Sequence, residues 1–170
     1  MGRCIDVVVE NTKGSRHKFE YDWRLGRMRL TRRVPVPTGF PAEYGFLPDT
    51  LSGDGDPLDA LVVLDEPFPG CVVSARPVGM LLMSDEEGTD PKIVCAPPSD
   101  PAWDGIDDID QVPRSVLAPI EAFFSSYKSD DPELWSETMG YAGRDEAWAE
   151  IDASIRRRQD LAGTGTGARR

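Results

Sequence analysis

Short strand-like segments separated by turn residues make up the first two-thirds of this 170-residue chain. The segments are rich in β-branched residues or alternate between apolar and polar side chains, and most are bounded by turn residues such as glycine, asparagine and proline. The predicted strands are residues 5–10, 16–22, 28–32, 60–64, 72–83 with an interruption at Pro77, and 93–96. Many short strands joined by turns are typical of a small β-barrel, so we expect a mainly β fold of the α+β class.

Two helices are predicted after the strands. Apolar residues recur at helical spacing within residues 116–128 and again near residues 147–155. Pro119 would disrupt the interior of the first helix, so this helix is expected to begin near Ala118 or to kink there. Three consecutive arginines, residues 156–158, are expected at the C-terminal end of the second helix, where positive charges interact favourably with the helix dipole.

The length and charge of the chain limit its organisation and its partners. We expect one domain over residues 1–160 and a flexible tail of small residues over 161–170. A net charge of −11 argues against non-specific binding to nucleic acid or to an anionic membrane, and no apolar run approaches the length of a membrane span. Three scattered cysteines favour thiols in a reducing compartment, which predicts a cytoplasmic location.

The most informative motif is the sequence Asp54-Gly55-Asp56-Pro57-Leu58-Asp59. Three carboxylates within six residues precede the apolar residues 61–64, which read as a buried strand. Mg²⁺ prefers oxygen ligands and binds through a few carboxylates together with substrate phosphates and water. The alternative interpretation is a solvated turn, since aspartate, glycine and proline are common turn residues. A second acidic cluster, residues 85–90, favours the metal site over the turn.

Basic and hydroxyl side chains accompany the two acidic clusters along the chain. Alternation within residues 16–22 predicts that Lys18 and Glu20 share one face of a strand. The others are Arg32, Tyr44, Lys92, Tyr127 and Lys128. In an acidic protein, such cations together with metal ions would be needed to hold an anionic substrate.

Taken in order, these segments resemble the soluble inorganic pyrophosphatases of family I. The signature of that family is Asp-x-Asp-Pro-x-Asp followed by apolar residues, which residues 54–60 match. The resemblance spans roughly residues 5–155 and includes Arg76-Pro77-Val78-Gly79, the spacing Asp85…Asp90-x-Lys92, and Phe123-Phe124-x-x-Tyr127-Lys128. It implies a five-stranded, OB-like barrel with flanking C-terminal helices. It also implies Mg²⁺-dependent hydrolysis of pyrophosphate to two phosphates by a metal-activated water, and a homo-oligomer, commonly a homohexamer.

The resemblance also implies a role for each matching residue. Asp56 matches the general base that activates the nucleophilic water. The implied metal ligands are Glu20, Asp54, Asp59, Asp85 and Asp90, with Glu10 as a further acidic member of the site. The implied phosphate-binding residues are Lys18, Arg32, Tyr44, Lys92, Tyr127 and Lys128.

Two departures from the family pattern leave alternatives open. Phe40 stands where many relatives carry a tyrosine, so a hydroxyl expected at the rim of the site is missing. The Gly-Lys that often follows Tyr-Lys is absent after Lys128. One alternative is therefore a catalytically impaired protein of this fold that binds phosphate or polyphosphate. Independently of these departures, a hydrolase of nucleoside triphosphates or polyphosphate with related metal chemistry is another alternative, although no glycine-rich phosphate loop or base-binding motif supports it. A nucleic-acid-binding barrel without catalysis would need a basic face with interleaved aromatic residues, which this chain lacks.

Overall fold

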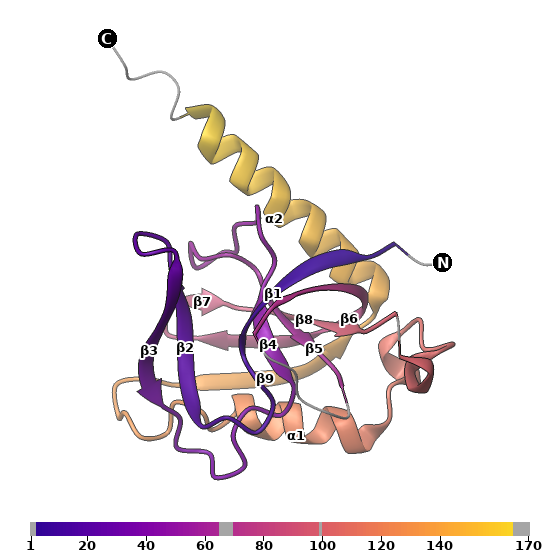
Figure 1. The fold of residues 1–170 in the computed structure, drawn as a ribbon, viewed down its shortest axis with the longest axis horizontal. Coiled ribbons are helices and arrows are strands. Elements are labelled where there is room, and N and C mark those ends of the chain that lie inside the picture. The colour runs from indigo at the N-terminus through magenta and orange to yellow at the C-terminus, as the bar shows by residue number, and fades with distance from the viewer. Residues whose placement is uncertain (1–2, 65–69, 99, 165–170) are drawn as a thin grey trace.

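The computed structural model describes residues 3–64, 70–98 and 100–164, and its centre is a closed β-barrel (Figure 1). The barrel contains, in spatial order, β1 (Ile5–Asn11), β4 (Glu43–Phe46), β5 (Asp59–Val62), β8 (Lys92–Ala96) and β6 (Val72–Asp85). The ring closes because β1 pairs with both β4 and β6. The prediction of a mainly β, α+β fold built on a five-stranded, OB-like barrel is confirmed.

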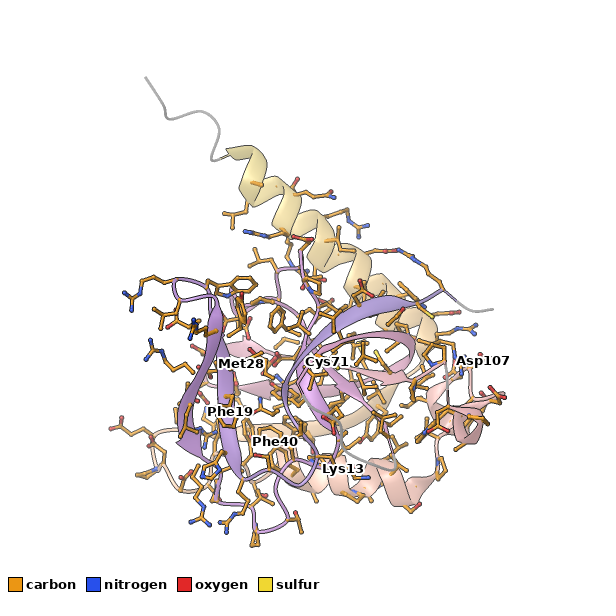
Figure 2. The ribbon with its side chains drawn as sticks, in the orientation of Figure 1. Lys13, Phe19, Met28, Phe40, Cys71 and Asp107 are labelled. Carbon is orange, nitrogen blue, oxygen red and sulfur yellow. The ribbon has the colours of Figure 1, made fainter. Side chains whose placement is uncertain are left out.

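Two of the predicted strands form a separate hairpin rather than part of the barrel. β2 (His17–Asp22) pairs only with β3 (Arg27–Arg33) in a two-stranded antiparallel sheet, which lies beside the barrel in Figure 1. Apolar side chains remain on its surface, including Met28, which Figure 2 labels. The hairpin therefore carries the predicted pair Lys18 and Glu20 at the side of the barrel rather than within its wall.

Strand β4, which belongs to the barrel, was not predicted from the sequence. All of its residues are buried, so it lacks the alternation that marks a strand with one solvated face. Gly45 in its centre is required by close packing, because a Cβ atom there would lie 1.9 Å from the carbonyl oxygen of Val8 in β1. Also unpredicted were β7 (Gly88–Thr89), β9 (Ser136–Ala142), and the 3₁₀ turns η1 (Pro101–Trp103) and η2 (Ile109–Gln111).

The predicted interruption of the long strand at Pro77 is wrong. β6 runs continuously from Val72 to Asp85, and the proline is accommodated by a shift of register against β8 between Pro77 and Gly79. A proline cannot donate a hydrogen bond to a neighbouring strand, so an irregularity at that position is the expected compensation.

The first helix begins earlier and ends earlier than predicted. α1 spans Arg114–Phe124 and contains Pro119 in its interior. The missing N–H of Pro119 removes one helical hydrogen bond. The helix nevertheless continues because its apolar face is buried in one of two core clusters, together with barrel residues such as Leu81 and Val94.

The second helix is longer than its apolar pattern. α2 spans Arg144–Thr164, and Ala147 and Ile151 pack into the other core cluster. The arginines at 156–158 therefore lie within the helix rather than at its C-terminal end, and its last turn has no basic residue. The helix also passes the predicted domain boundary at residue 160, while residues 165–170 of the predicted tail lie outside the described residues. No helix in the described part is long and apolar enough to cross a membrane.

Candidate active site

A cavity of about 260 Å³ opens between the β2–β3 hairpin, the barrel and the loop that joins β4 to β5. Seven predicted site residues line it: Glu10, Lys18, Glu20, Tyr44, Asp54, Asp56 and Asp59. The closed barrel and the hairpin thus bring together residues that are up to 49 positions apart between Glu10 and Asp59. Five of the eleven lining residues are aspartate or glutamate and one is lysine, which makes the cavity acidic.

A buried lysine pairs with two of the predicted site carboxylates. Lys92 at the start of β8 is 1% exposed, and its Nζ atom lies 2.5 Å from a carboxylate oxygen of Asp59 and 2.5 Å from one of Asp90. The hydroxyl of Tyr44 donates to the same oxygen of Asp59 at 2.5 Å. Burial would lower the pKa of Lys92, but the charges of Asp59 and Asp90 outweigh burial and raise it. Lys92 is therefore a permanent cation that holds two carboxylates at the cavity.

A second ion-paired group forms where β6 ends. Lys128 places its Nζ atom 2.7 Å from Asp85 and 2.5 Å from Glu86. Burial alone would raise the pKa of Asp85, but the hydrogen bonds from Lys128 and from the backbone of Glu87 hold it below its ordinary value. Asp85, Glu86 and Glu87 can bring one oxygen each within 4.8 Å of the others. Glu86 was not predicted as a site residue, and the only sequence signal was its position next to Asp85.

The loop between β4 and β5 carries two more predicted carboxylates, Asp54 and Asp56. Its ends are tied together because the N–H of Leu47 donates to the carbonyl of Leu58 at 2.8 Å. At its tip, Gly55 has a φ of 96°, a conformation that glycine adopts without strain, and the N–H of Asp56 donates to a carboxylate oxygen of Asp54 at 3.0 Å. Burial, followed by the charge of Asp54, raises the pKa of Asp56.

Two further predicted carboxylates line the cavity, Glu20 on β2 of the hairpin and Glu10 on β1. Lys18 and Glu20 lie on the same face of β2, as predicted, and form an ion pair at 2.6 Å. Glu10 on β1 accepts a hydrogen bond from the backbone N–H of Tyr21 at 2.6 Å. Burial is the largest cause that raises the pKa of Glu10 to about 7.

Arg32 and Tyr127 lie against each other beyond the cavity lining. The guanidinium of Arg32 donates to the carbonyl of Tyr127 at 3.1 Å and lies 5.5 Å from the centre of its ring. The ring of Tyr127 packs against Phe123 and Phe124 of α1. Burial is the largest cause that raises the pKa of the Tyr127 hydroxyl, so this group remains a hydrogen-bond donor at neutral pH.

Phe40 lies in the core and not at the rim of the site, contrary to the expectation from the sequence. Its side chain is 2% exposed and lies inside the fold in Figure 2. The ring stacks on that of Tyr44 with 5.4 Å between centres and contacts Phe123 at 4.9 Å. Phe40 therefore supports the tyrosine that reaches Asp59.

The donor set of the site fits a hard divalent cation. Its possible ligands are carboxylate oxygens, and neither cysteine nor histidine is among the residues that line the cavity. Burial and then the Lys92 charge have opposite effects on Asp90, and the net result raises its pKa to about 6. Burial and mutual repulsion therefore raise the free energy of several ionised carboxylates here, and a bound cation would lower it.

Aromatic side chains at the mouth of the cavity were missed by the sequence analysis. Trp23 is 67% exposed, contacts Tyr21 with 4.7 Å between ring centres, and contacts Phe46 at 5.6 Å. All three line the cavity. Trp23 has no recognisable pattern in the sequence, because an aromatic residue in a turn has no periodic context.

Comparisons with known proteins agree with this arrangement. A family model described as inorganic pyrophosphatase matches residues 7–159. The inorganic pyrophosphatase of Streptomyces coelicolor is 46% identical over 160 residues, which are 94% of this chain and 98% of the relative. That of Thermus thermophilus is 42% identical over 90% of this chain and 89% of the relative.

Solved structures give the same result for the fold. The inorganic pyrophosphatase of Helicobacter pylori superposes with a TM-score of 0.88 at 37% identity, covering 92% of this chain and 94% of the other. The Thermus thermophilus enzyme superposes with a TM-score of 0.87 at 41% identity, covering 92% and 91%.

Proposed function

Because this chain belongs to the inorganic pyrophosphatase family, we propose that it hydrolyses inorganic pyrophosphate to two phosphate ions with Mg²⁺ as its divalent cofactor. The observation that carries the proposal is the acidic cavity, in which Lys18 lies among the carboxylates and the buried Lys92 pairs with Asp59 of its lining. Pyrophosphate carries several negative charges that repel an attacking water, so both positive side chains and metal are needed beside it.

Carboxylates from five parts of the chain would hold the metal. We assign Asp54, Asp59 and Asp90 to the main metal positions, Asp85 to metal that arrives with the substrate, and Glu20 and Glu10 to the outer acidic part of the site. A Mg²⁺ ion held by these carboxylates would neutralise phosphate charge and lower the pKa of a coordinated water. Zinc is disfavoured because it prefers nitrogen and sulfur ligands.

Asp56 is the proposed general base. It lies on the loop tip in the cavity, and its raised pKa shows that its carboxylate has an increased affinity for a proton. Such a carboxylate can accept a proton from the attacking water while Asp54 and Asp59 remain committed to metal. A general base close to its optimal geometry contributes ~10²–10⁴-fold to the rate.

Cationic and hydroxyl groups would hold the phosphate oxygens. Lys18 already lies in the cavity, while Lys92 and Lys128 lie against carboxylates that metal would compete for. The fork of Arg32 suits two phosphate oxygens at once. We assign the same role to Tyr44 and Tyr127, whose raised pKa values keep their hydroxyl protons in place.

A phosphate-release assay tests the function. The purified protein is mixed with pyrophosphate with Mg²⁺, with chelator, and with Mg²⁺ restored after chelation. We expect release only when Mg²⁺ is present. Turnover without any divalent ion would refute the metal mechanism. Binding of pyrophosphate without turnover under any divalent ion would favour the impaired protein instead.

We also propose a homohexamer in the cytoplasm. The assembly follows the resemblance to bacterial family members, and exposed apolar side chains such as Leu30 and Met139 offer surface for it. Pyrophosphate itself is the only partner proposed besides further copies of the chain. Light scattering of the purified protein would measure the assembly, and a monomeric mass would refute it.

A further inference from the structure

The loop that carries Asp54 and Asp56 is hydrogen-bonded to the C-terminal helix at Leu51. The backbone N–H of Leu51 donates to the carbonyl of Ser154 at 3.0 Å, and its carbonyl accepts from Nε of Arg157 at 2.8 Å. Both backbone polar groups of Leu51 are therefore used by α2. Residues 51 and 157 are 106 positions apart, and Figure 1 shows α2 running past this side of the barrel.

The attachment continues from Leu51 to the catalytic carboxylates. The adjacent Ser52 donates its N–H to the carbonyl of Asp56 at 2.7 Å, and its own carbonyl accepts from Gly55 at 3.3 Å. The N–H of Asp56 in turn donates to Asp54. A displacement of Leu51 would thus be passed through two backbone hydrogen bonds to the segment that holds both acids.

The helix end of the attachment is rigid. Ala147 and Ile151 are 0% and 1% exposed and belong to a core cluster with barrel residues. Ser154 is fully buried and donates its hydroxyl to the carbonyl of Ile151 at 2.8 Å. The guanidinium of Arg157 is itself held by Glu150, at 2.5 Å from its second terminal nitrogen. Within one planar group, Nε therefore binds the loop while Nη2 binds Glu150 on the helix.

We propose that Arg157 is a positioning residue that holds the acidic loop in the geometry needed for metal binding and catalysis. This inference rests on the proposed function, because it gives Asp54 and Asp56 the roles assigned above. A lysine cannot replace Arg157 fully, since one ammonium lacks the rigid fork that joins Leu51 and Glu150. Groups that orient metal ligands typically contribute ~10–100-fold to metal affinity or activity. The indirect route through the backbone places Arg157 at the lower end of that range.

Three variants of the full chain test the proposal. Arg157→Ala removes both contacts, Arg157→Lys keeps the charge, and Arg156→Ala is the matched control. Arg156 is exposed, and its side chain forms no hydrogen bond or ion pair within the part of the chain that the structure describes. Hydrogen exchange of the amides in residues 47–58 reports on the loop, calorimetric titration with Mg²⁺ reports on the metal, and steady-state kinetics separates kcat from KM.

For Arg157→Ala we expect faster exchange in residues 47–58, an about tenfold weaker Mg²⁺ affinity and an about tenfold lower kcat. KM for pyrophosphate should stay unchanged, because the proposed phosphate-binding residues lie on other elements. Arg157→Lys should give smaller changes in the same direction, and Arg156→Ala should match the wild type.

The proposal is overturned if Arg157→Ala and Arg156→Ala show the same loop exchange and the same Mg²⁺ affinity. If Arg157→Ala does not fold, loop exchange and Mg²⁺ affinity are measured on Arg157→Lys instead. Wild-type values of both quantities in that variant would overturn the proposal. If the wild type does not hydrolyse pyrophosphate, the proposed function fails, while exchange and calorimetry still determine whether Arg157 orders the loop.

Discussion

Glu10 is expected to make the metal-free protein less stable as the pH rises. In the unfolded chain its carboxyl ionises near its ordinary pKa of 4.5, whereas burial in the folded protein raises the pKa to about 7. Between these two pH values the folded state binds more protons than the unfolded state, so the free energy of unfolding falls with increasing pH. The loss of folding stability caused by ionisation of Glu10 is absent below pH 4.5 and fully present above pH 7.

The size of the effect follows from the shift. One pH unit corresponds to ~1.4 kcal/mol, so the shift amounts to ~3 kcal/mol at most. Glu10 is partly exposed, and solvent screening reduces the expected value to ~2–3 kcal/mol. Asp90 and Asp56 also have raised pKa values and act in the same direction, so the slope of the wild type alone does not isolate Glu10.

The substitution Glu10→Gln isolates the contribution of Glu10 to this pH dependence. Glutamine is neutral at every pH and retains an oxygen that can accept the hydrogen bond from Tyr21. Urea unfolding is measured for both proteins with chelator, at one protein concentration, from pH 4 to pH 8. The variant should match the wild type near pH 4 and be more stable by ~2–3 kcal/mol at pH 8. A difference between the two proteins that stays constant across this range would refute the reasoning.

Three further substitutions test individual roles. Asp59→Asn removes a charge beside Lys92 and should weaken Mg²⁺ activation while circular dichroism remains native; unchanged metal dependence would leave Asp59 as a structural partner of Lys92 and Tyr44. Asp56→Asn should lower kcat by ~10²–10⁴-fold with little effect on KM, and near-normal turnover across pH would remove it as the base. Phe40→Tyr should leave catalytic efficiency unchanged or lower it in steady-state kinetics, since the added hydroxyl would lie in the core beside Tyr44 and Phe123 and not at the rim of the site. An inert wild type that this change restores by many orders of magnitude would instead indicate an impaired enzyme.

The sequence determined the fold class and the composition of the site. Alternation and β-branched residues mark strands because they report which face of a segment is buried, and this information is local. The carboxylates of residues 54–59 and 85–90 could be proposed as metal ligands because their residue types and close spacing favour a compensating cation, while their individual roles came from the family resemblance. Phe40 shows the limit of this approach, since a departure from a motif does not reveal whether the side chain is buried.

Only the tertiary structure decided which strands close the barrel and which ionic groups meet. β4 has no local pattern because both of its faces are buried, and its place depends on Gly45 lying close to Val8. Lys92 reaches Asp59 across 33 positions, and Arg157 reaches Leu51 across 106. Such contacts depend on closure of the barrel and on the packing of α2, and their energies arise between distant segments. A pattern read along the chain contains no information about these distances.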